Sequence, residues 1–172
     1  MDKKLNFLGI GPKIAVVLLP WLALSIVLSS MGIGFFQFAP ETTLILRIPG
    51  IFLMLAGVIS YIASAKTLLK GLRETRLMTS GVYGLCQHPL YASLILLIIP
   101  ALSLLLNSWL VLTTSFIGYI LFRVFIHHEY QELEKFFGEA YRKYKSETPE
   151  FFPLPIRKSK RAGQYLFPGK DE

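Results

Sequence analysis

The feature that most limits how this chain can fold is the length of its uncharged stretches. No Asp, Glu, Lys or Arg occurs from Ile14 to Pro40, or between Arg76 and Arg123. About 20 consecutive apolar residues can cross a bilayer as a helix, and 53% of the 172 residues are hydrophobic. The sequence therefore predicts an all-α integral membrane protein whose whole length, residues 1–172, forms a single membrane domain.

Four transmembrane helices are expected within residues 14–126. The polar pair Asn107-Ser108 is the only break between the last two, which should form a tight antiparallel hairpin. A cleaved signal peptide is the alternative for the first helix, because a basic start precedes an apolar run. The run is long for a signal, which favours a retained helix. The expected spans are 14–36, 48–65, 90–106 and 109–126.

The basic residues indicate the orientation of the chain. With four spans, one face carries the N-terminus, the basic loop 66–76 and everything after residue 126, whereas the other carries Arg47. The positive-inside rule then places both termini in the cytosol. Orientation and attraction to anionic lipid explain the net charge of +7 better than a nucleic-acid partner does. The sequence leaves the oligomeric state open.

The pattern changes after the fourth span. An apolar stripe at helical spacing predicts one amphipathic cytosolic helix over residues 129–146, lying on the membrane or over the bundle. A basic, proline-rich tail, 147–172, follows. The stripe consists of Leu133, Phe136, Phe137, Ala140, Tyr141 and Tyr144.

A polar cluster stands where the third span begins. Pro89 suits the first helical position, and the free N–H groups of that turn, with the helix dipole, can bind an anion. His88 would be a donor beside this position, with Tyr83 and Tyr91 as aromatic walls. An ordinary helix cap with interfacial tyrosines is the alternative.

Other reactive side chains give less specific signals. Arg123 lies inside the fourth span, where an ionisable residue usually faces the bundle and marks a function, although it can also snorkel to the headgroups. His127 and His128 are adjacent and point in different directions on a helix, so no metal site is expected. The single cysteine, Cys86, excludes an intrachain disulfide and is interpreted as an apolar filler.

Two ordered motifs resemble those of the membrane methyltransferases typified by isoprenylcysteine carboxyl methyltransferase, with the phospholipid N-methyltransferases as relatives. The similarity covers residues 77–155, and the membrane hairpin lies between the motifs. The matching positions are Leu77, Thr79, Gly81, Tyr83, His88, Pro89, Tyr91, Asn107, Glu129, Leu133, Phe137, Gly138, Tyr141, Tyr144 and Pro149.

This resemblance implies S-adenosyl-L-methionine as the methyl donor. It also implies a lipid or lipid-like acceptor at the cytosolic interface, an isoprenylcysteine carboxylate being one candidate. A helix start and a His can hold the cofactor carboxylate, a Glu its ammonium or hydroxyls, and aromatic faces its sulfonium. The cofactor-binding residues carried over are Leu77, Met78, Tyr83, His88, Pro89, Leu90, Tyr91 and Glu129.

The chain departs from the family pattern at three positions. Gln87 replaces an Arg, Tyr130 replaces a Glu, and Phe125 occupies the place of an Arg that binds the acceptor carboxylate. Arg123 and His127 are the nearest candidates for orienting the acceptor, and no residue is identified as a catalytic base. Two alternatives remain: an NADPH-dependent sterol-type reductase, and a non-catalytic membrane scaffold.

Overall fold

The computed structural model describes residues 9–38 and 43–151. Every regular element assigned within these ranges is a helix, and none is a strand. Three are long and apolar: α1 (Gly11–Ser30), α2 (Thr43–Glu74) and α5 (Trp109–Phe137). A shorter apolar column, Pro89–Leu105, is built from three consecutive segments. These are α3 (Pro89–Ala92), the π-helical η4 (Ser93–Ile98) and α4 (Ile99–Leu105), and the remaining elements are η1 (Gly34–Phe36), η3 (Gly81–Gly84) and α6 (Glu139–Glu147).

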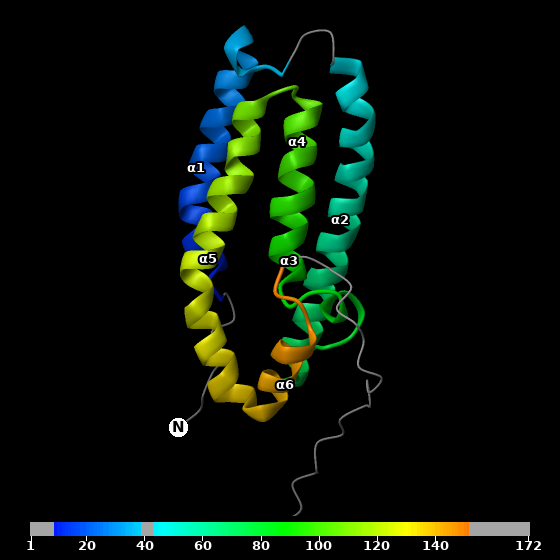
Figure 1. The fold of residues 1–172 in the computed structure, drawn as a ribbon, viewed down its shortest axis with the longest axis vertical. Helices are drawn as coiled ribbons and strands as arrows, with labels where there is room; N and C mark the ends of the chain where they lie inside the picture. Colours follow the sequence, from blue (N-terminus) through cyan, green and yellow to red (C-terminus); the bar gives the residue numbers. More distant parts are fainter. Residues whose placement is uncertain (1–8, 39–42, 152–172) are drawn as a thin grey trace, which may run out of the picture.

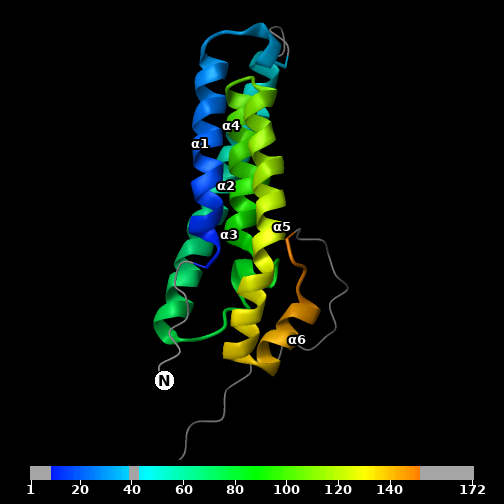
Figure 2. The ribbon, with the colours of Figure 1, turned by 90° about the vertical axis from the view of Figure 1, so that its left-hand side faces the viewer.

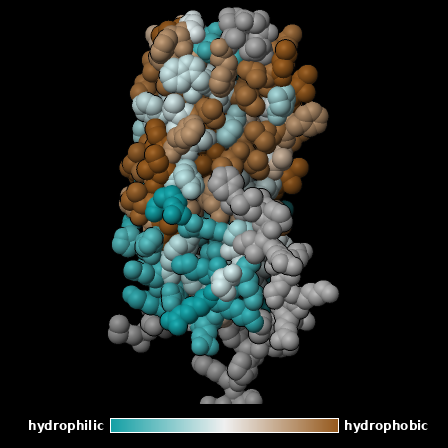
Figure 3. Space-filling view, viewed as in Figure 1, coloured by the Kyte–Doolittle hydropathy of each residue, from teal (hydrophilic) through white to brown (hydrophobic). Residues whose placement is uncertain are grey.

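The four columns run side by side along the long axis of the molecule (Figures 1 and 2). In Figure 3 most of their length is hydrophobic, and one end is hydrophilic. Apolar side chains on the outer surface, such as Val16 and Leu44, are 75% and 74% exposed, as expected for residues that face lipid tails. The prediction of an all-α integral membrane protein is confirmed.

Small residues allow α2 to approach the column of α3, η4 and α4. Gly50, Gly57, Ser64 and Gly71 recur every seven positions on the buried side of α2. A Cβ atom on Gly57 would lie 2.8 Å from Cγ1 of Ile98, so only glycine fits without a shift. Small residues at such interfaces are how membrane helices pack closely. On the other side of the bundle, α5 packs against both α4 and α1.

The first helix is shorter than the sequence predicted. It ends at Ser30 instead of reaching Phe36, because Gly32 adopts φ +71° and turns the chain. Residues 34–36 then form a separate 3-10 turn.

The second helix is longer than the predicted span 48–65, and the predicted basic loop 66–76 was wrong for most of its length. The helix continues to Glu74, and the loop starts at Thr75, which has φ +51°. No proline interrupts the stretch after Pro49, so nothing ends the helix at the membrane surface. Its final turns carry Lys66, Lys70 and Arg73.

The hairpin predicted at Asn107-Ser108 is confirmed. Asn107 adopts φ +50°, and the amide of Ser108 donates to the carbonyl of Ser103 at 2.9 Å. The turn brings α4 and α5 together as antiparallel neighbours.

The predicted single helix 129–146 is wrong, because the structure divides this region between two helices. Helix α5 continues without a break to Phe137, and the chain then reverses at Gly138, which has φ +57°. Positive φ is readily available to glycine and costly for other residues. The reversal folds α6 back beside α5 (Figure 1), so Tyr141 and Tyr144 become buried against the bundle.

Most of the predicted tail, 147–172, lies outside the described residues. Its first part is ordered by packing, since Thr148 and Phe151 are buried. The ring of Phe151 lies 4.8 Å from that of Phe122 on α5, centroid to centroid.

Candidate functional site

The two motifs expected to share one membrane interface do meet. His88 precedes the first turn of α3, and Glu129 lies on α5 beyond the hydrophobic span. His88 Nδ1 is 3.8 Å from Oε1 of Glu129, and the two side chains are 5% and 19% exposed. This distance is too long for a hydrogen bond, so each group keeps capacity for another partner.

His88 is a buried, neutral imidazole. Pro89 takes the first helical position after it, as predicted, and the His88 carbonyl accepts from the amide of Ala92 at 3.0 Å. Burial, followed by the charge of Lys145, lowers the pKa of His88 to about 3. Its Nε2 atom is buried and has no hydrogen-bond partner among the residues that the structure describes. A buried nitrogen of this kind can hydrogen-bond a ligand.

The start of α1 closes over Glu129. The amide of Ile10 donates to Oε2 of Glu129 at 3.4 Å. A Cβ atom on Gly9, which has φ +49°, would lie 2.9 Å from the same oxygen. This segment was not assigned to the site from the sequence, yet its glycine and backbone amide shape the site.

Aromatic rings surround His88 on several sides. Its ring centroid lies 5.2 Å from Phe122, 5.5 Å from Tyr130 and 6.1 Å from Tyr91. The Tyr91 hydroxyl extends to the first turn of α1, 3.6 Å from where a Cβ of Gly11 would be. Aromatic faces of this kind attract cations.

The remaining residues predicted to hold a cofactor lie at the same end of the bundle. Burial, and then the charge of Glu129, raise the pKa of Tyr83, and the Tyr83 carbonyl accepts from Tyr144 Oη at 2.7 Å. Leu77 packs against the buried hydrophobic core, which includes Phe122. Met78 packs against Gly71 of α2. Pro89 is buried and Leu90 is half-buried.

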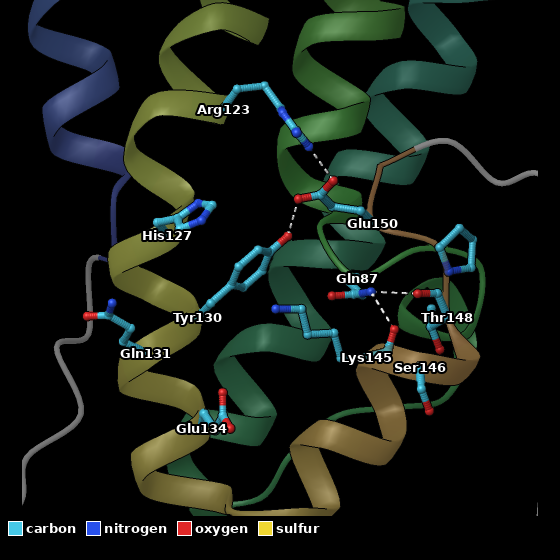
Figure 4. A pocket seen from close by; sticks show the side chains of 11 residues that line it. Gln87, Arg123, His127, Tyr130, Gln131, Glu134, Lys145, Ser146, Thr148 and Glu150 are labelled. Atoms are coloured by element: carbon cyan, nitrogen blue, oxygen red, sulfur yellow. Dashed lines mark hydrogen bonds and ion pairs between the residues drawn. The ribbon is translucent and has the colours of Figure 1, made fainter.

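A cavity of about 590 Å³ lies between α5, α6 and residues 148–150 (Figure 4). Volumes of this order are typical of small-molecule sites. Arg123 and His127, the two residues predicted to orient an acceptor, both line it from one face of α5. The other lining residues are Gln87, Tyr130, Gln131, Glu134, Lys145, Ser146, Thr148, Pro149 and Glu150.

Glu150 bridges two side chains of this cavity. Arg123 Nη1 contacts Oε2 of Glu150 at 2.5 Å, and the Tyr130 hydroxyl donates to Oε1. Lys145 lies on the same wall, with its Nζ 3.9 Å from the centroid of the Tyr130 ring. Arg123 therefore turns toward the cavity, with a carboxylate as its partner (Figure 4).

Gln87 fastens the segment that carries Glu150. Its Nε2 donates to the carbonyls of Lys145 at 3.2 Å and Thr148 at 2.5 Å. Its backbone amide donates to the carbonyl of Pro149 at 2.9 Å. Gln87, which stands where the resemblance predicts an Arg, thus has a structural role: it joins the loop before α3 to the end of α6.

Cys86 and the His pair contribute no further reactive centre to the described site. Cys86 is buried, and burial raises the pKa of its thiol, which keeps it protonated as an apolar filler. Within residues 9–38 and 43–151, no group of three or more His, Cys, Asp or Glu side chains is placed to hold a metal ion.

The site also contains residues that sequence reasoning missed. Gly9 carries a weak signal, since a glycine next to a helix start often marks a close approach. Glu150 and Lys145 carry none, because their roles depend on the reversal at Gly138 and on the path of the chain after α6.

Comparison with known proteins identifies the family. The profile of the isoprenylcysteine carboxyl methyltransferase (ICMT) family matches residues 43–135, from the start of α2 nearly to the end of α5. The chain belongs to this family. The predicted resemblance is confirmed, and the protein is a membrane methyltransferase. No curated protein and no solved structure matches the chain.

Proposed function

We propose that the protein transfers the methyl group of S-adenosylmethionine to a lipid or lipid-like acceptor at the cytosolic face of the membrane. The observation that carries the proposal is the pairing of the buried His88 with the half-buried Glu129 at the polar end of the bundle, where Nδ1 and Oε1 are 3.8 Å apart. Two opposed polar groups of this kind suit a zwitterionic ligand, and the amino-acid end of the cofactor is zwitterionic.

The residues around the pair fit this cofactor. The Glu129 carboxylate can accept hydrogen bonds from an ammonium or hydroxyl group. The unpartnered Nε2 of His88, beside the start of the helical column Pro89–Leu105, can hydrogen-bond a carboxylate. The half-buried ring of Tyr91, which packs on the buried ring of Phe122 with 5.5 Å between the centroids, can stabilise a sulfonium.

Bound at this site, the cofactor would supply a methyl group activated on its sulfonium. The protein's own residues then have to align the acceptor and exclude water, and alignment alone can supply much of a rate enhancement. Ile10 and Tyr144 cover the site from α1 and α6. Arg123 and His127 face the cavity where α5 leaves the hydrophobic span, a position from which they can orient a head group.

The charge distribution supports a cytosolic site with both termini on the same side. One end of the molecule is hydrophilic (Figure 3). The last turns of α2 and α6, which lie at that end in Figures 1 and 2, carry basic residues, while Arg47 lies near the opposite end of α2. By the positive-inside rule the basic end faces the cytosol. A lipophilic acceptor would enter sideways from the bilayer, and the whole chain acts as one membrane domain.

Calorimetric titration of detergent-purified protein with S-adenosylhomocysteine tests the cofactor site. Wild type should bind, and His88→Ala and Glu129→Gln should each weaken binding at least tenfold. The matched controls His128→Ala and Glu132→Gln alter exposed residues of the same types and should bind as wild type does.

A parallel titration with NADPH separates the reductase alternative. Binding of NADPH and not of S-adenosylhomocysteine would replace the proposal with a reductase. Binding of neither ligand by folded protein would favour a scaffold.

A further inference from the structure

We infer that Glu150 sets the charge of the acceptor: the site takes a lipid whose reacting head group is neutral or cationic, and it excludes a carboxylate. The inference rests on the proposed function and concerns the cavity beside the cofactor residues. Its basis is that the position best suited to bind an anion in this cavity already holds a carboxylate of the chain.

Arg123 and Tyr130 form that position. The guanidinium contacts one oxygen of Glu150, and the phenol donates to the other, so both oxygens are used. An incoming carboxylate would compete with Glu150 for these two side chains, since charge-assisted bonds from Arg are what usually recognise a carboxylate.

The other charges of the cavity do not provide a substitute. Glu134 lies 2.5 Å from Nε of Arg142, and the Lys145 ammonium is stacked over the Tyr130 ring. Two fixed cations, Arg123 and Lys145, face two carboxylates, Glu134 and Glu150, among the lining residues. The lining therefore has no excess of fixed positive charge with which to attract an anionic head group.

Glu150 is held in place by the residues on both sides of it. Gln87 hydrogen-bonds the carbonyls of Thr148 and Pro149. Phe151 is 4% exposed, and its ring lies 5.4 Å from that of Tyr119. A group tethered at its site competes at an effective concentration of about a millimolar or more, so a free carboxylate is a weak competitor.

The ion pair is poorly explained as a stabilising contact. The Arg123 and Glu150 side chains are 52% and 34% exposed, and exposed ion pairs contribute little to stability. Its position in the cavity, where Glu150 contacts both Arg123 and Tyr130, instead suits a role in selecting the acceptor.

Two amphiphiles that share the same dodecanoyl tail but differ in head group test the inference on the full-length protein in a non-ionic detergent. N-dodecanoylglycine carries a carboxylate, and N-dodecanoylethanolamine carries a neutral hydroxyl. By native mass spectrometry, wild type should bind the neutral amphiphile at least tenfold more tightly. Glu150→Ala should tighten binding of N-dodecanoylglycine at least tenfold. Glu150→Gln removes the charge but still fills the space, so its gain in affinity should be smaller.

The control Glu147→Ala removes an exposed carboxylate from the same helix end and should change neither affinity. Adding Arg123→Gln to Glu150→Ala should abolish the gain. Equal wild-type binding of the two amphiphiles, no gain in Glu150→Ala, or no binding of either amphiphile would each overturn the inference. Binding of S-adenosylhomocysteine, measured in the same samples, reports separately on the proposed function.

Discussion

Replacing Gln87 with Ala should loosen α6 and residues 148–151 while leaving the helical bundle intact. The Gln87 side chain is buried and donates to the carbonyls of Lys145 and Thr148. Leaving a buried polar group without its partner costs about 1–3 kcal/mol, which corresponds to roughly 5- to 150-fold more frequent local opening. The backbone bond from residue 87 to Pro149 survives the substitution, so the segment should remain docked most of the time.

Hydrogen exchange read by mass spectrometry measures this opening directly. Peptides covering residues 141–151 should exchange about 5- to 150-fold faster in Gln87→Ala, and peptides from α2 and α4 should be unchanged. Gln131→Ala is the control, since Gln131 is an exposed residue that lines the same cavity. If residues 141–151 exchange no faster than in the control, or if exchange rises throughout the bundle, the anchoring role of Gln87 is refuted.

Three further predictions concern close contacts and charge. Gly57→Ala should lower the free energy of unfolding by about 1–3 kcal/mol, because its Cβ would lie 2.8 Å from a side-chain atom of η4. Thermal melts measure this loss. The control Gly34→Ala, whose Cβ would have nothing within 4 Å, should melt as wild type does. Gly9→Ala should weaken binding of S-adenosylhomocysteine in calorimetry, whereas Gly32→Ala, which shares the positive φ but has open space around it, should not. The pKa of His88 is about 3 in the folded protein, against 6.5 as its ordinary value. The unfolded chain thus binds more protons between these values, so stability should fall by up to ~1.4 kcal/mol per pH unit on acidification below 6.5. Melting curves of His88→Gln should show a shallower pH dependence, and an unchanged slope would contradict the assignment.

The juxtaposition of His88 and Glu129 could be predicted because it follows from membrane topology. Uncharged runs fix where the helices lie, and an even number of crossings returns the chain to the same face. The turn at Asn107 was equally predictable, since it is the only polar break in a long apolar stretch.

The region after the membrane could not be predicted in the same way. Helical periodicity continues through Gly138. A glycine can mark the end of a helix, but the same residue is also tolerated inside one, so the sequence does not show that the chain reverses there with positive φ. Once the reversal is missed, the contacts of Lys145 and Glu150 are missed as well, because both depend on α6 folding back. The extent of α2 was underestimated for a different reason: hydropathy reports where the membrane ends, and the helix continues beyond it to Glu74.

Transfer of a labelled methyl group from S-adenosylmethionine into lipid tests the central claim most directly. Purified protein would be reconstituted with a total lipid extract of its own source membranes, and label would be counted in the organic phase. We expect label to accumulate with wild type and Glu132→Gln and to fall at least tenfold with Glu129→Gln. Label that stays in the aqueous phase, from protein that binds S-adenosylhomocysteine, would contradict a lipid acceptor; equal labelling by Glu129→Gln would contradict the assigned site.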